Sequence, residues 1–294
     1  MLKARRLLKS RPRRLKGWSP NRMVPNGLTV MALCAGLTAI RFALEARWEL
    51  AVLAIVAAGV LDGLDGRAAR LLKGTSRFGA ELDSLSDFVS FGAAPAVLIY
   101  EWSLVGFKGL GWAVALLYAV CCALRLARFN SEIDLAEESQ PLLAKSYFKG
   151  VPAPAGAGLA LLPVMVWLQF DIDLPRSPWI ATPVMVAVAL LMISRLPTFS
   201  LKLATVPHKY VLPVLLLVGL MVAALASAPW ATLIVVGLIY LASLPLAFVL
   251  QPMQTRREAS AAAAAADAAT AGPREAESEA GVVVSIPPRP SARG

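Results

Sequence analysis

Four aspartates in one short polar stretch are the residues of this chain best suited to chemistry. The four are Asp62, Asp65, Asp83 and Asp87, and they lie at or near the ends of two long apolar runs. A carboxylate at membrane depth is costly, so acidic residues in such positions are expected to be functional and to have a partner. The stretch therefore marks the candidate functional site.

Helical spacing places these acids on two surfaces that can face each other. At about 100° per residue, one wedge of the first helix carries Asp62, Asp65, Gly66 and Ala69. One face of the next helix carries Gly79, Asp83 and Asp87. Residues 74–76 have the composition of a tight polar turn. We therefore expect two antiparallel helices that set one pair of carboxylates against the other.

The donor types favour a divalent cation. Four like charges this close cannot all stay ionised unless cations neutralise them. An oxygen-only ligand set, without cysteine or histidine nearby, suits Mg²⁺, Mn²⁺ or Ca²⁺ rather than zinc. Arg70 and Arg77 add the cationic donors that a phosphate site needs. A plainer alternative is a solvated turn with charges at helix ends, which the shared faces of the acids disfavour.

The small residues beside the acids have two interpretations. Gly66 and Ala69 leave space on the helix face that carries Asp62 and Asp65. That space could admit a ligand, or it could simply let two helices pack closely.

The order and spacing of these residues resemble the signature of the CDP-alcohol phosphatidyltransferases. The matching series is Asp62, Asp65-Gly66, Ala69-Arg70, Gly79, Asp83 and Asp87, with eight residues between Arg70 and Gly79. The resemblance implies that the four aspartates hold Mg²⁺ or Mn²⁺, with Ca²⁺ as a further option, and that Asp87 is also the catalytic general base. It implies a CDP-diacylglycerol site formed by Asp62, Gly66, Ala69, Arg70, Ser76 and Gly79.

The rest of the chain has the composition of a polytopic membrane protein. It has 294 residues, of which 57% are hydrophobic. Eight apolar runs are expected to be helical: 27–44, 48–66, 80–101, 107–127, 154–170, 178–194, 210–227 and 230–250. We predict an all-α integral membrane bundle of about eight transmembrane helices. The first six resemble the family core, and the last two resemble an addition to it.

Basic residues are divided unevenly between the two sides of this predicted bundle. With both termini on one side, the segments on that side hold twenty-five Lys or Arg, and the opposite loops hold three. The positive-inside rule then places both termini, and the aspartate turn with them, in the cytoplasm.

The two ends of the chain differ from the apolar domain expected over residues 23–250. Residues 1–22 contain nine Lys or Arg and no acid. Such an arm could bind nucleic acid, but ahead of a membrane span we expect it to lie on anionic lipid instead. Residues 251–294 are rich in Ala and then in Gly, Pro, Ser and Glu, so we expect a disordered cytoplasmic tail.

Two further cytoplasmic segments carry basic and amide groups towards the aspartates. They contribute Arg125, Arg128, Asn130 and Lys149. Positive-inside anchoring explains any one of these residues. Together, basic groups that converge on an acidic metal site would suit an anionic substrate.

Three segments resemble the bacterial phosphatidylserine synthases within the family. Two are the segments just described, which read RLARFN and FKGVPAP, and the third is the SDFVSFGAAPA that follows the aspartates. The implied reaction transfers a phosphatidyl group from CDP-diacylglycerol to L-serine and releases CMP. The four residues would then bind serine. The resemblance also implies a homodimer in the bacterial inner membrane, with the active site facing the cytoplasm.

Two alternatives remain open at this point. The first is another member of the same family, with glycerol 3-phosphate or an inositol as the acceptor. The second is an ion-coupled transporter with carboxylates along a cation path. A transporter is expected to show internal repeats and acids near the membrane midplane. This sequence shows no repeat, and its acids cluster at one cytoplasmic turn.

Overall fold

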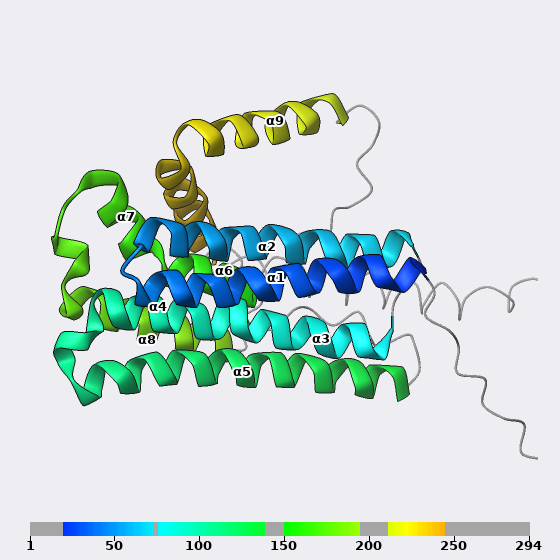
Figure 1. The fold of residues 1–294 in the computed structure, drawn as a ribbon, viewed down its shortest axis with the longest axis horizontal. Helices are drawn as coiled ribbons and strands as arrows, with labels where there is room; N and C mark the ends of the chain where they lie inside the picture. Colours follow the sequence, from blue (N-terminus) through cyan, green and yellow to red (C-terminus); the bar gives the residue numbers. More distant parts are fainter. Residues whose placement is uncertain (1–19, 73, 75, 139–149, 195–210, 245–294) are drawn as a thin grey trace, which may run out of the picture. The chain divides into compact units, whose positions relative to one another are not determined.

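The computed structural model describes residues 20–72, 74, 76–138, 150–194 and 211–244, and these are all helical or in short connections (Figure 1). The prediction of an all-α protein is confirmed for these residues, because no strand occurs among them. Lys149, the tail 251–294 and most of the basic arm lie outside the described residues.

Each of the eight predicted apolar runs contains helix. The first half holds α1 (Pro20–Leu44), α2 (Trp48–Leu71), α3 (Arg77–Asp87), the π-helix η1 (Phe88–Ala93), α4 (Ala94–Trp102), the short η2 (Leu104–Phe107) and α5 (Gly109–Glu138). The second half holds α6 (Ala153–Ala160), α7 (Leu162–Phe170), the short η3 (Leu174–Arg176), α8 (Pro178–Ile193) and α9 (Val211–Ser227). A further helix, without a label in Figure 1, spans Pro229–Leu244.

This is a membrane protein, because three of the described helices are long and apolar enough to cross a bilayer. They are Met23–Leu44, Arg77–Trp102 and Gly109–Ser131. Helices α6 and α7 meet at a bend of 42° and would together make a fourth span. The other apolar helices among the described residues are shorter, namely Pro178–Ile193, Leu212–Ser227 and Pro229–Leu244.

The connection between α1 and α2 is a tight turn that contains an ion pair between Arg41 and Glu45. Arg41 Nε donates to Glu45 Oε1 at 2.8 Å, which lowers the pKa of Glu45. Ala46 takes a positive φ of 56°, which lets the chain reverse within three residues. Arg41, the basic residue in the last turn of α1, is thus paired with a neighbouring acid.

Serine side chains hold α1 close against α3 and η1. Ser86 Oγ donates to the backbone oxygen of Thr29, and Ser90 Oγ donates to that of Ala32, both at 3.2 Å. A Cβ at Gly36 would overlap Ser90, so only glycine allows this approach. Small residues are a usual means of close helix packing in membranes. These contacts fix the height of α3, and of its aspartates, along α1.

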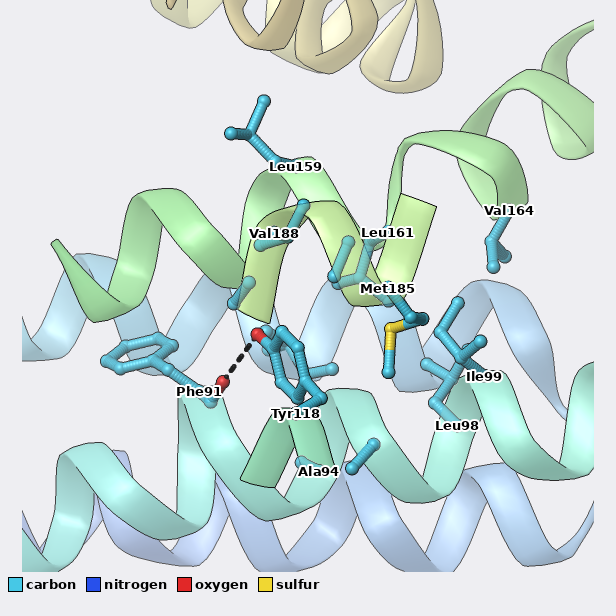
Figure 2. Close-up of a cluster of buried hydrophobic side chains, with 14 of the residues drawn as sticks. Phe91, Ala94, Leu98, Ile99, Tyr118, Leu159, Leu161, Val164, Met185 and Val188 are labelled. Atoms are coloured by element: carbon cyan, nitrogen blue, oxygen red, sulfur yellow. Dashed lines mark hydrogen bonds between the residues drawn. The ribbon is translucent and has the colours of Figure 1, made fainter. Parts of the chain in front are cut away.

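A proline explains the irregular helix that follows Asp87. Pro95 has no N–H, so it cannot donate to the carbonyl of Phe91 as a regular α-helix would require. Tyr118 on α5 donates its hydroxyl to that carbonyl at 2.9 Å (Figure 2). Helix η1 takes the π form over this segment, a feature that is frequent at functional sites.

Contacts along α5 fix its register against α3, η1 and α4, beside which it runs (Figure 1). Cys122 lies against Gly92, where a Cβ would be 3.2 Å from the sulfur. Further along, Asn130 Nδ2 donates to Ser84 Oγ at 2.9 Å. Because the residue numbers rise on α5 and fall on its neighbour, the two segments are antiparallel. Arg125 then lies between these two contacts, level with the start of η1.

Candidate active site

Three carboxylates from two helices meet in one group. One carboxylate oxygen from each of Asp62, Asp83 and Asp87 lies within 4.8 Å of the others. Asp62 comes from α2, and the other two come from successive turns of α3. All three side chains are half-buried. This arrangement fits a divalent cation, since its donors are all carboxylate oxygens.

Asp65 stands apart from this group in the structure. Its side chain is only 4% exposed, and its Oδ2 accepts a hydrogen bond from Thr29 Oγ1 at 2.5 Å. The same hydroxyl also lies within hydrogen-bond distance of the carbonyl of Pro25, at 3.1 Å, so its one proton is shared between the two acceptors. The fourth predicted metal ligand is therefore held from α1 by Thr29.

The turn between α2 and α3 is capped at both ends. Gly74 donates its N–H to the carbonyl of Ala69 at 2.9 Å, closing the end of α2. Ser76 is the N-cap of α3, and its Oγ accepts the N–H of Gly79 at 3.0 Å. The ends of both helices that carry the carboxylates are therefore capped by described residues of the predicted turn.

The residues predicted to bind the nucleotide leave open space beside the carboxylates and add one positively charged side chain, Arg70. A Cβ at Gly66 would meet nothing nearer than Arg70 Nη1, at 3.9 Å, so this face is open. Gly79 is crowded instead, because a Cβ there would lie 2.9 Å from Asn26 Oδ1. Ala69 is half-buried and Arg70 is exposed. The structure therefore places Gly66 close to Arg70, whereas Gly79 packs against Asn26 of α1.

The predicted acceptor residues divide into placed and unplaced ones. Arg125 lies close enough to Asp87 for their charges to interact. Asn130 is bound to Ser84, the residue next to Asp83. Arg128 is half-buried on the same helix, and its carbonyl accepts from Ser131 at 2.9 Å. Lys149 lies outside the described residues.

An apolar cavity of about 250 Å³ lies close along α2 to the carboxylate group. Helix α2 lines it with Ile55, Val56 and Gly59, the last of which is about one turn from Asp62. The other walls are Phe91, Pro154, Ala155, Gly158, Leu159, Leu161, Met165, Leu233, Val236, Gly237 and Tyr240. The site thus joins a charged end to an apolar interior.

Three residues at this site were missed by the sequence reasoning. Asn26 and Thr29 reach α3 and Asp65 from α1, and Tyr240 lines the cavity from the helix Pro229–Leu244. The sequence held one signal for the first two, since they are the polar residues at i and i+3 where the first apolar run begins. Tyr240 gave no local signal, because its importance depends on packing against distant helices.

The chain belongs to the CDP-alcohol phosphatidyltransferase family. The family's sequence profile matches residues 22–194, which include all four aspartates. A second profile, described as CDP-alcohol phosphatidyltransferase 2, matches residues 209–245. The protein is therefore a membrane-bound transferase, and its acidic group is the metal-binding candidate of that family's fold.

Several similar proteins carry one name, CDP-diacylglycerol–serine O-phosphatidyltransferase. The protein of Mycobacterium leprae is 41% identical over 225 residues, 76% of this chain and 74% of that protein. That of Mycobacterium tuberculosis H37Rv is 40% identical over 225 residues, 76% and 78% of the two chains. The Bacillus subtilis protein is 39% identical over 140 residues, 47% of this chain and 74% of that one.

Proposed function

We propose that this protein transfers the phosphatidyl group of CDP-diacylglycerol to L-serine, giving phosphatidylserine and CMP. The observation that carries the proposal is the group Asp62, Asp83 and Asp87, which lies about one helical turn from the lining of an apolar cavity. A lipid joined to a nucleotide pyrophosphate needs both environments at once. The choice of serine as acceptor is supported by the similar proteins described above, which are named CDP-diacylglycerol–serine O-phosphatidyltransferase.

The four aspartates are proposed to hold the metal ions, Mg²⁺ or Mn²⁺ with Ca²⁺ as a further option. Bound there, the cation would supply charge neutralisation for the pyrophosphate and for the leaving phosphate. Asp87 would accept the proton of the serine hydroxyl, because a hydroxyl is a weak nucleophile at neutral pH. The serine oxygen then bonds to the phosphorus that bears diacylglycerol. The bond from that phosphorus to the CMP oxygen breaks, and CMP leaves with the electron pair.

The turn and α2 would bind the nucleotide end of the donor. The open face at Gly66 and Ala69 would let the nucleotide approach the helix backbone, and Arg70 would contact phosphate. Ser76 and Gly79 would shape the end of this site, because they cap α3 and meet α1.

Arg125 is the acceptor residue whose loss should be easiest to measure. Replacing it with glutamine should raise the serine KM about tenfold to a hundredfold, since a charge-assisted contact is worth about 1.5–3 kcal/mol. Steady-state kinetics with varied serine would show this, and the KM for CDP-diacylglycerol should not change. Arg67→Gln, an exposed arginine on α2, is the matched control. An unchanged serine KM in Arg125→Gln would move the carboxylate site elsewhere.

The apolar cavity is proposed to receive an acyl chain of CDP-diacylglycerol. A Cβ at Gly158 would meet no heavy atom within 4 Å, so a larger side chain can enter the cavity without a backbone clash. Gly158→Leu should lower kcat/KM for CDP-diacylglycerol by roughly tenfold to a hundredfold, because a donor misplaced by about 1 Å can lose 10²-fold. Initial rates with varied donor measure this.

The control for that substitution is Gly219→Leu on α9, which also has open space around it. It lies outside the cavity lining and should leave the donor kinetics unchanged. Equal effects of the two substitutions would contradict the acyl-chain assignment.

The membrane arrangement is part of the proposal. We infer eight spans with both termini in the cytoplasm of a bacterial cell, so that the carboxylates face the side from which serine arrives. The excess of basic residues on that side supports the orientation. The same proposal includes an arm at 1–22 on anionic lipid, a transmembrane domain at 23–250, a tail at 251–294, and a homodimer in the inner membrane.

One assay tests the function directly. Purified protein is given labelled CDP-diacylglycerol and a panel of acceptors: L-serine, glycerol 3-phosphate and inositol. We expect CMP release and labelled phosphatidylserine when L-serine is the acceptor, and no labelled product with the other two acceptors. If product forms only with glycerol 3-phosphate or inositol, the family assignment holds but the proposed acceptor is wrong. No product with any acceptor, in the presence of Mg²⁺ or Mn²⁺, would contradict the proposal.

A further inference from the structure

Two buried polar groups beside the carboxylates lack hydrogen-bond partners among the described residues. They are Nε of Arg125 and the hydroxyl of Tyr240. A buried donor without a partner costs about 1–3 kcal/mol, and more when it is charged. Such groups are therefore expected to be satisfied by something that binds.

The two groups come from helices far apart in the sequence. Tyr240 ends a stripe on the helix Pro229–Leu244 that lines the cavity together with Leu233, Val236 and Gly237. This helix is seated against α7, because a Cβ at Gly237 would lie 2.9 Å from Leu162 Cδ2. Arg125 on α5 and the Tyr240 hydroxyl are close enough to interact electrostatically, as Arg125 also does with Asp87.

We propose that the Tyr240 hydroxyl and the Arg125 guanidinium together bind the carboxylate of the acceptor amino acid. This inference rests on the proposed function and adds a specificity residue from outside the aspartate motif. One carboxylate oxygen would accept from Arg125 and the other from Tyr240. The acceptor's hydroxyl would then point to Asp87, which Arg125 adjoins.

The acceptor carboxylate explains the pair better than the acyl part of the donor lipid does, because the donor's pyrophosphate is assigned to the metal site and Arg70. A buried guanidinium needs a charged partner, because an unpaired buried charge is costly. Asp87 interacts with Arg125, but it also belongs to the carboxylate group with Asp62 and Asp83. An acyl ester is neutral and would leave the arginine charge uncompensated. A free carboxylate satisfies both groups.

The test removes one oxygen from the protein and one carboxylate from the acceptor. In the full-length protein, Tyr240→Phe should raise the serine KM about tenfold. Its KM for CDP-diacylglycerol should stay the same. Ethanolamine is serine without the carboxylate, so the rate measured with this acceptor should be equal in Tyr240→Phe and in the unmodified protein. The variant therefore loses discrimination between the two acceptors, which a merely structural defect would not cause.

Thr182→Val is the matched control, since Thr182 also carries a buried hydroxyl without a partner among the described residues. It lies near the start of α8, outside the cavity lining, and should leave the serine KM unchanged. Thermal unfolding in detergent shows whether each variant is folded. If Tyr240→Phe does not fold, Tyr240→Met, which also lacks the hydroxyl, is measured in its place.

The outcomes separate this inference from the function on which it rests. If the unmodified protein makes no phosphatidylserine, the proposed function is wrong. If it does and the serine KM of the folded variant is unchanged, only the role of Tyr240 is wrong. A rise in the KM for CDP-diacylglycerol instead of the serine KM would assign the hydroxyl to the donor lipid and overturn the inference.

Discussion

Asp62→Asn and Asp83→Asn should each reduce turnover by roughly 10²–10³-fold or more, because each removes a charged ligand from the group that stabilises the leaving phosphate. Asparagine keeps the shape of the side chain, so the bundle should remain folded. Mn²⁺ titration by calorimetry should show weakened binding in both variants. The two readouts together tie the loss of activity to the metal.

The control for these substitutions lies on the same helix as Asp83. Glu81 is an exposed acid of α3 that is not part of the carboxylate group, and Glu81→Gln should bind Mn²⁺ and turn over normally. Excess chelator should abolish the activity of the unmodified protein. Full activity under chelation, or in either aspartate variant, would rule out the proposed metal site.

Asp87→Asn should lower kcat by about 10²–10⁴-fold, the usual contribution of a general base. The amide keeps an acceptor oxygen but cannot take the proton of the serine hydroxyl. The loss should appear in the chemical step, so CDP-diacylglycerol should still bind. Single-turnover rates combined with a binding titration of the donor would show both effects.

Asp62→Asn provides the comparison that separates a base from a metal ligand. It should weaken donor binding, since the charge that neutralises the pyrophosphate is lost with the metal. If Asp87→Asn bound the donor equally poorly, the main role of Asp87 would be metal ligation. If Asp87→Asn turned over at nearly the normal rate, another group would be the base.

Local spacing was sufficient to predict the two carboxylate helices and the turn between them. A helix places residues three and four apart on one face wherever it lies. Capping by Ser76 depends only on residues within one turn. Helix boundaries were less well predicted, because α2 continues to Leu71 and α5 to Glu138, past the ends of their apolar runs. Polar residues can extend a helix beyond the apolar segment without ending it.

The sequence alone determined the family, the all-α class and the set of acids, since these depend on residue types and spacing. It could not determine which acid meets which neighbour. Asp62 and Asp65 are three residues apart, so their side chains diverge by about 60° around α2. The packing of α1 against both α2 and α3 brings Asp62 close to Asp83 and Asp87, and places Asp65 against Thr29.

Tyr240 and the cavity were likewise decided only by the tertiary structure. The cavity walls come from residues far apart in the sequence, such as Gly59, Gly158 and Tyr240. Interactions over such separations depend on how whole helices pack, and no local pattern encodes them. Local geometry therefore specified the reactive groups, whereas helix packing specified their partners and the space beside them.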